Sequence, residues 1–169
     1  MTRRKPLERG YSFRFFEGPP SKRAIAFVDG QNLFHGAREA FGYSFPNYDV
    51  IALARAACHT CGWTLKQVRF YTGVPDAADN PFWYHFWTAK TAAMGRQGVV
   101  VYTRRLKYRR RSVTLPDGTD QTFMVGEEKG IDVRIALDLI RLTHRRTFDV
   151  GILSARTRTS RKSQARSGC

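Results

Sequence analysis

Short apolar runs alternate with helical stretches along most of this chain, and that alternation limits the folds it can adopt. Runs rich in β-branched and aromatic residues predict strands over 24–28, 68–74, 99–102 and 149–153. Apolar residues at helical spacing predict helices over 31–41, 48–58 and 131–144, and a long one beginning at Pro81. Strands that alternate with helices are typical of a parallel sheet with helices on both faces. We therefore expect one α/β domain over residues 24–154 with a mainly parallel central sheet.

Residues 104–125 interrupt this alternation. A run of basic residues precedes Leu115-Pro116-Asp117-Gly118, a turn signal, and a second β-type run follows at 122–125. We expect a β-hairpin insertion here. Its basic run is either a solvated face or, in a nucleic-acid-binding protein, a set of phosphate contacts. The residues of this run are Arg104, Arg105, Lys107, Arg109, Arg110 and Arg111.

The formal net charge of +15 suggests an anionic partner, but much of it belongs to the two ends of the chain. Residues 1–23 and 155–169 together hold 12 of the 29 Lys and Arg, against two Glu. Residues 24–154 hold the other 17, against 12 Asp and Glu, a net charge of +5. We expect the first segment to be a basic, disordered arm and the last a basic tail. The charge of the domain itself does not decide its function.

The cysteines and the hydropathy of the chain predict its surroundings. Three cysteines, an odd number, favour a reducing compartment over a disulfide framework. Cys58 and Cys61 have C-x-x-C spacing, but two ordinary cysteines are favoured over a redox pair or a zinc site, which needs four ligands. No stretch approaches the roughly 20 apolar residues of a membrane helix, and no apolar segment of a signal peptide follows the basic start. We expect a cytoplasmic protein with no membrane partner.

Two acidic residues stand where an open parallel sheet binds its ligands. Asp29 closes the first predicted strand, and ligands of such sheets bind outside the carboxyl ends of the strands. Asp132 stands in the first turn of the last predicted helix. Carboxylates gathered at this edge would bind Mg²⁺ or Mn²⁺, with Asn32 one turn away to orient a ligand. Each acid also has a simpler interpretation: Asp29 as a helix N-cap, and Asp132 as a charge that interacts with a helix dipole.

Three other acidic residues indicate a site less clearly. Asp138 follows Arg134 by four positions and precedes Arg141 by three, so an ion pair on an exposed helix face is favoured over a metal ligand. Glu127 and Glu128 are interpreted as loop charges.

Two segments of the sequence resemble the motifs of one known family. They are Phe-Val-Asp-Gly-Gln-Asn-Leu-Phe at 27–34 and Glu-Lys-Gly-Ile-Asp-Val at 128–133, the second followed by Ala-Leu-Asp-Leu at 136–139. In this order they are similar to the NYN domain family, the LabA-like proteins of the PIN-like nuclease group. The resemblance covers residues 24–154. It implies a three-layer Rossmann-like fold of PIN-like type and a ribonuclease that depends on Mg²⁺ or Mn²⁺.

The same resemblance implies roles for individual residues. Asp29 and Asp132 would be the catalytic, metal-binding acids, with Asp138 as a third candidate ligand. Asn32 would be their neighbour in the catalytic site, and Lys129 would belong to the loop that presents Asp132. RNA would be the partner, with its phosphates held by Lys129 and the basic residues of the hairpin.

The sequence departs from this family after the last predicted strand. Family members continue with Ser and an Asp-x-Asp segment that supplies another carboxylate, whereas here Ser154 is followed by Ala-Arg-Thr-Arg-Thr at 155–159. We expect impaired ribonuclease activity, or a non-catalytic RNA-binding or decayed protein, and an apolar sheet face without its covering helix. A shifted reading frame would explain residues 155–169, because one allowed set of codons encodes Gln-Asp-Gln-Asp-Leu-Ser-Glu-Val in another frame.

Overall fold

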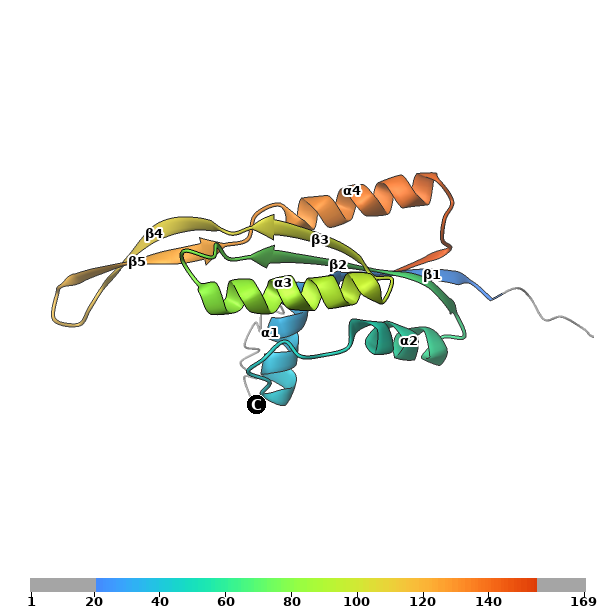
Figure 1. Cartoon of the computed structure of the whole chain (residues 1–169), viewed down its shortest axis with the longest axis horizontal. Coiled ribbons are helices and arrows are strands. Elements are labelled where there is room, and N and C mark those ends of the chain that lie inside the picture. The colour runs from blue at the N-terminus through green and yellow to red at the C-terminus, as the bar shows by residue number, and fades with distance from the viewer. Residues whose placement is uncertain (1–20, 155–169) are drawn as a thin grey trace, which may run out of the picture.

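The computed structural model describes residues 21–154, which form a parallel sheet, four helices and a hairpin (Figure 1). The sheet has the order β3-β2-β1-β6, with all pairings parallel, and contains β1 (Arg23–Asp29), β2 (Thr64–Val74), β3 (Val100–Arg105) and β6 (Val150–Ser154). The helices are α1 (Gly30–Phe41), α2 (Val50–Thr60), α3 (Pro81–Arg96) and α4 (Ile131–His144). Strands β4 (Lys107–Thr114) and β5 (Asp120–Glu127) form a separate antiparallel hairpin. The expected α/β class, parallel central sheet and hairpin insertion are confirmed.

Strand β1 lies between two hydrophobic cores. Ala26 and Val28 face the core formed with α2 and α3, and Ile25 and Phe27 face the core formed with α4. Figure 1 shows α4 on one side of the sheet and α2 and α3 on the other. Because successive side chains of a strand point to opposite faces, an unbroken apolar run is what such a position requires.

Several elements begin or end at other residues than the sequence predicts. Helix α2 starts at Val50, because the Asp49 side chain accepts hydrogen bonds from the backbone at the start of the helix. Strand β3 continues to Arg105, so Arg104 and Arg105 pair with β2 and belong to the sheet and not to the hairpin. Charged side chains are tolerated there because β3 is an edge strand.

The expected basic arm and basic tail fall largely outside the described residues. The structure describes the arm only from residue 21 onward, and Arg23 is already the first residue of β1. Residues 155–169 lie outside it altogether. Cys58, which is buried, and Cys61, which is exposed, are both free thiols. Within residues 21–154, none of the helices has the length and apolar character needed to span a membrane.

Apolar side chains are exposed where the sheet ends at β6. Leu153 pairs with Phe27, so it lies on the α4 side of the sheet, yet it is 51% exposed. Val133, Leu137 and Ile140 of α4 are also exposed. The segment expected to lack a covering helix, 155–169, lies outside the described residues, so that expectation stays a prediction.

An ion pair joins the first residue of β1 to the residue before β6. The guanidinium of Arg23 donates to both carboxylate oxygens of Asp149, at 3.1 and 2.9 Å, and the Arg23 backbone N–H donates to the same carboxylate at 2.8 Å. The Asp149 N–H in turn donates to the Arg23 carbonyl. The hydrogen bonds that the Arg23 side chain and backbone donate lower the pKa of Asp149 from 3.8 to about 2.

This lowered pKa predicts how stability depends on pH. A carboxylate whose pKa is lower in the folded than in the unfolded state stabilises the fold above its ordinary pKa, and loses that effect as the pH falls toward the folded value. We expect Asp149→Asn to lower the melting temperature at neutral pH and to have little effect near pH about 2. Thermal melts of the parent protein and of Asp149→Asn, from neutral pH down to about 2, measure this difference in melting temperature. Asp120→Asn of the hairpin is the control. A difference that stays constant with pH would contradict the assignment.

Asp138 fastens α4 to β2. Its side chain is 3% exposed, and its carboxylate accepts hydrogen bonds from Arg69 and Tyr71 of β2, each at 3.0 Å. Arg134 and Arg141 on its own helix also pair with it, at 3.2 and 3.3 Å. The predicted helix ion pairs are therefore confirmed, but the expected exposed position is wrong. Arg69, itself 8% exposed, lies 69 residues away in sequence, so helical spacing could not show this partner.

Removing the Asp138 carboxylate should leave a buried guanidinium without its counter-charge. We expect Asp138→Ala to lower the free energy of unfolding by about 3–5 kcal/mol. Arg141→Ala removes a half-exposed partner of the same carboxylate and should cost at most about 1 kcal/mol. Urea denaturation of both variants gives the comparison. Equal losses of unfolding free energy in the two variants would mean that the buried pair of Asp138 with Arg69 stabilises the fold no more than the pair with Arg141.

Candidate functional site

Asp29 ends β1 and starts α1. Its Oδ1 accepts from the Asn32 backbone N–H at 2.9 Å, and its Oδ2 accepts from the Asn32 side-chain amide at 2.8 Å. The simpler interpretation of Asp29 as an N-cap is therefore confirmed. Capping does not remove the side chain from the sheet edge, because the cap lies at the carboxyl end of β1. Asn32 holds the carboxylate from one side.

The loop before α4 approaches the same edge through two glycines. Glu128 accepts a hydrogen bond from the Gly73 N–H of β2. A Cβ on Gly73 would lie 2.6 Å from the Glu128 carboxylate, so a larger residue there would displace the Glu128 side chain. Gly130, with φ of 79°, turns the chain into α4, and a Cβ there would lie 2.5 Å from a guanidinium nitrogen of Arg104. The loop thus reaches the end of β2 with Arg104 beside it.

The two predicted motifs meet around a hollow of about 460 Å³, which we call the acidic hollow. Asp29, Asn32, Lys129 and Asp132 all contribute to it, as the sequence predicts. Glu128, interpreted from the sequence as a loop charge, contributes a third carboxylate. Its place directly before the Lys-Gly-Ile-Asp segment was the available signal. The full lining is Asp29, Gln31, Asn32, Glu128, Lys129, Gly130, Ile131, Asp132 and Val133.

Burial and mutual repulsion act on these carboxyl groups. Burial raises the pKa of Glu128 to about 7, and the charges of Asp29 and Asp132 add to the shift, although the hydrogen bond from Gly73 opposes it. Burial likewise raises the pKa of Asp29, with a smaller contribution from Asp132, against the lowering effect of its hydrogen bonds. A cation in the hollow would relieve this repulsion and lower both pKa values.

The donor set of the acidic hollow fits a hard divalent cation. Carboxylate and amide oxygens are the ligands that Mg²⁺ and Mn²⁺ accept, and Mg²⁺ usually takes one or two carboxylates and keeps several waters. Asp29 and Asp132 therefore suffice chemically. Within residues 21–154, however, no three His, Cys, Asp or Glu side chains form a group that could hold a metal ion. The acids line one hollow without converging on one point.

Asp138 does not belong to this hollow. It is absent from the lining, and its oxygens are engaged by the arginines and tyrosine that fasten α4 to β2. Of the three acids suggested as metal ligands, the structure brings Asp29 and Asp132 together and gives Asp138 a structural position.

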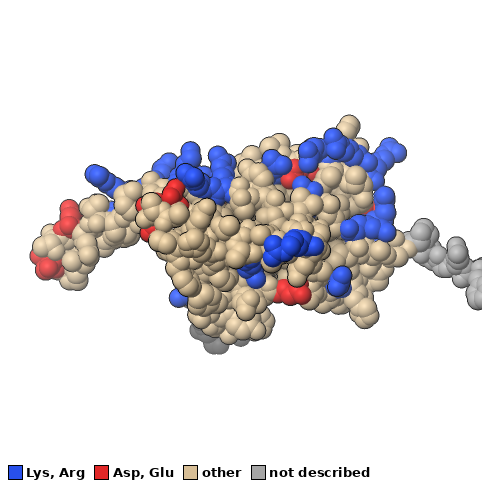
Figure 2. Space-filling view, in the orientation of Figure 1, with Lys and Arg blue, Asp and Glu red and all other residues tan. Residues whose placement is uncertain are grey.

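The predicted RNA-binding cations fall into distinct environments. Arg109 and Arg111 pair with Glu127, at 3.4 and 2.6 Å, and Arg105 pairs with Asp76 at 3.1 Å. Lys129 lines the acidic hollow, and Arg104 lies beside Gly130. Figure 2 shows Lys and Arg gathered along the edge of the molecule that carries the hairpin and α4, with acidic side chains at the hairpin tip.

The end of β6 lies beside the site. Ser154 pairs with Val28, the residue before Asp29, so the chain leaves β6 next to the acidic hollow. The segment that lacks Asp-x-Asp begins at Ala155, outside the described residues.

Comparisons with protein families, with curated proteins and with solved structures find no match to this chain.

Proposed function

We propose that this protein is a ribonuclease of PIN-like, NYN type that depends on Mg²⁺ or Mn²⁺ and acts in the cytoplasm. The observation that carries the proposal is the acidic hollow, in which Asp29, Glu128 and Asp132 surround one space at the carboxyl edge of a parallel sheet. The resemblance of the two motifs to that family supports the same conclusion. Lys129 and Arg104 add positive charge beside the hollow, where a phosphate of RNA would approach.

The residues of the hollow divide the work. Asp29 and Asp132 would hold the ion, and a bound ion would stabilise charge on the phosphoryl group and acidify a water molecule. Asn32 fixes the direction of the Asp29 carboxylate through its amide. Lys129 and Arg104 bind and orient the RNA backbone. Because three carboxylates repel a phosphate, these cations are needed for the substrate to approach.

A non-catalytic RNA-binding protein is the second candidate. It is favoured by the absence of a three-ligand acidic group within residues 21–154 and by the lack of any acid in residues 155–169 of the sequence. The basic side chains would then hold RNA without cleavage. Substitution of the hollow's carboxylates separates the two candidates.

Asp29→Asn tests cleavage without removing the helix cap, because Asn is as good an N-cap as Asp. We expect the rate of RNA cleavage with Mn²⁺ to fall by about 100-fold or more, since several kcal/mol of transition-state stabilisation depend on the ion. RNA affinity should not fall. Asp49→Asn is the matched control, because Asp49 caps α2 in the same way but lies outside the hollow. It should cleave at the parent rate.

Two results would contradict the ribonuclease proposal. Equal cleavage by Asp29→Asn and Asp49→Asn would mean that the chemistry is not in the acidic hollow. RNA binding without cleavage by the parent protein would establish the RNA-binding candidate instead.

Metal binding has a readout that does not depend on activity. An ion that binds only the folded protein stabilises it by about 2.7 kcal/mol at 100 times its dissociation constant. We expect Mn²⁺ to raise the melting temperature of the parent protein, and Asp132→Asn, which changes an exposed side chain, to reduce the increase. Asp120→Asn on the hairpin serves as the control. The same increase in all three proteins would place the ion elsewhere.

A further inference from the structure

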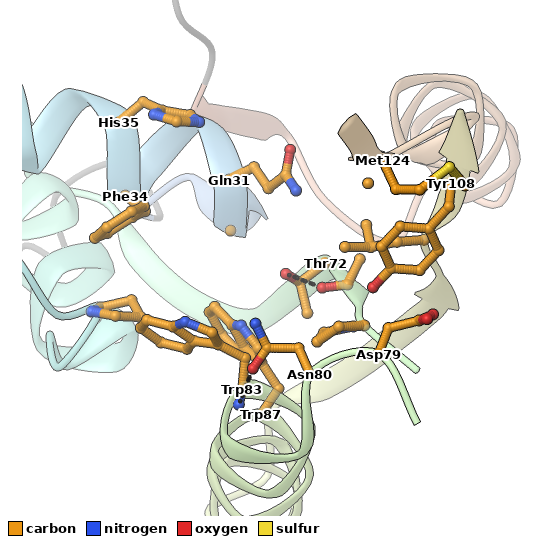
Figure 3. Close-up of a pocket in the computed structure, with 16 residues that line it drawn as sticks. Gln31, Phe34, His35, Thr72, Asp79, Asn80, Trp83, Trp87, Tyr108 and Met124 are labelled. Carbon is orange, nitrogen blue, oxygen red and sulfur yellow. Dashed lines mark hydrogen bonds between the residues drawn. The ribbon is translucent and has the colours of Figure 1, made fainter. Parts of the chain in front are cut away.

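A pocket of about 510 Å³ opens between α1, α3 and the hairpin, next to the acidic hollow. Figure 3 shows Phe34 and Trp83 on one side of it and Tyr108 and Met124 on the other, with Gln31 and Thr72 between them. We call it the aromatic pocket. Of these side chains, only Gln31 also lines the acidic hollow.

The aromatic pocket and the acidic hollow are adjacent compartments of one surface. Gln31 lines both of them. Gly73 lines the aromatic pocket and donates its N–H to Glu128, which lines the acidic hollow. One ligand could therefore reach from the aromatic pocket into the acidic hollow.

The lining combines ring faces with a few polar groups. Trp83 is held by the rings of Phe45 and Phe86, each with its centroid 5.3 Å away, so its position is fixed by packing. The side-chain oxygen of Asn80 accepts a hydrogen bond from the backbone N–H of Trp83, which leaves the side-chain N–H groups of Asn80 for a ligand. The Gln31 amide offers a donor and an acceptor. Flat rings with such polar groups match a nucleobase, which stacks on its faces and forms hydrogen bonds at its edge.

Within residues 21–154, the hairpin presents a cation without an ion pair on the same side. Residues two apart on a strand share a face, so Arg110 lies on the face of β4 that carries Tyr108. Arg109 and Arg111 lie on the opposite face and are engaged by Glu127. Arg110 has no ion pair within residues 21–154. An aromatic ring followed by an exposed arginine is the combination that holds a base and its phosphate in single-stranded nucleic acid.

We propose that the aromatic pocket binds an unpaired base of single-stranded RNA, stacked against Tyr108 and Trp83. The adjoining phosphate would then lie at the acidic hollow, and that part of the proposal rests on the proposed function. A base in a duplex cannot enter, because it would first have to leave its partner and its stack. The enzyme therefore selects single strands through this pocket.

Binding in EDTA isolates the pocket from catalysis. A short labelled single-stranded RNA, and the same RNA annealed to its complement, are titrated with the parent protein and with Tyr108→Ala, and anisotropy is recorded. Loss of one stacked base should weaken single-strand affinity by about 10-fold and leave duplex affinity unchanged. Tyr43→Ala, an exposed tyrosine outside the pocket, is the matched control and should bind as the parent does.

Two further variants make the result independent of folding defects in Tyr108→Ala. Tyr108→Phe keeps the ring and should keep the affinity. Arg110→Ala changes an exposed side chain and should weaken single-strand binding with a shallower dependence on salt.

Each outcome decides one proposal. Equal RNA affinities for Tyr108→Ala and Tyr43→Ala would overturn the proposed base pocket. The same result is expected when the true occupant of the pocket is a segment of a protein. A parent protein that binds duplex as tightly as single strand, or binds neither, would overturn it too. Cleavage of the same RNA with Mn²⁺ tests the ribonuclease separately. If single-strand binding depends on Tyr108 but the RNA is not cleaved, the base-pocket proposal stands and the ribonuclease proposal is wrong.

Discussion

Strand β1 carries apolar side chains on both faces, and these stay out of water only when helices cover the sheet above and below. This burial places β1 inside the sheet, with β2 and β6 as parallel neighbours. Because the three strands run in the same direction, their carboxyl ends reach one edge. Asp29 ends β1 there beside Tyr71 of β2, and Ser154 ends β6 one residue away. The acidic hollow is positioned by this edge.

Sequence periodicity was sufficient for the elements and for the parallel sheet, since helices and strands repeat at different spacings. Asp29 and Asp132 were expected in one site because their two motifs resemble those of one family, and not because of periodicity. Periodicity could not find contacts between residues far apart in the chain. Arg69 reaches Asp138 over 69 residues, and Gly73 reaches Glu128 over 55. The burial of Asp138 and the third carboxylate were missed for that reason.

Carboxylates lie in two different environments in this fold, the cluster around Asp138 and the acidic hollow. Around Asp138 the donors of Arg69, Tyr71 and Arg134 more than offset burial, and the pKa of Asp138 falls below its ordinary value. In the acidic hollow burial prevails, and the pKa of Glu128 rises. The first cluster satisfies its charges within the fold, whereas the second leaves repulsion unrelieved. Groups whose pKa values are shifted by burial and by like charges often lie at functional sites, which supports the choice of the acidic hollow as the proposed metal site.

The hairpin joins the two compartments mechanically. Tyr108 pairs with Gly126 across the hairpin, and Glu128 follows two residues later. A ligand that contacts Tyr108 would therefore also act on the chain that carries Glu128. The two ligands proposed above, a base in the pocket and a cation in the hollow, would then be thermodynamically linked. If one ligand raises the affinity for the other by some factor, the second ligand raises the affinity for the first by the same factor.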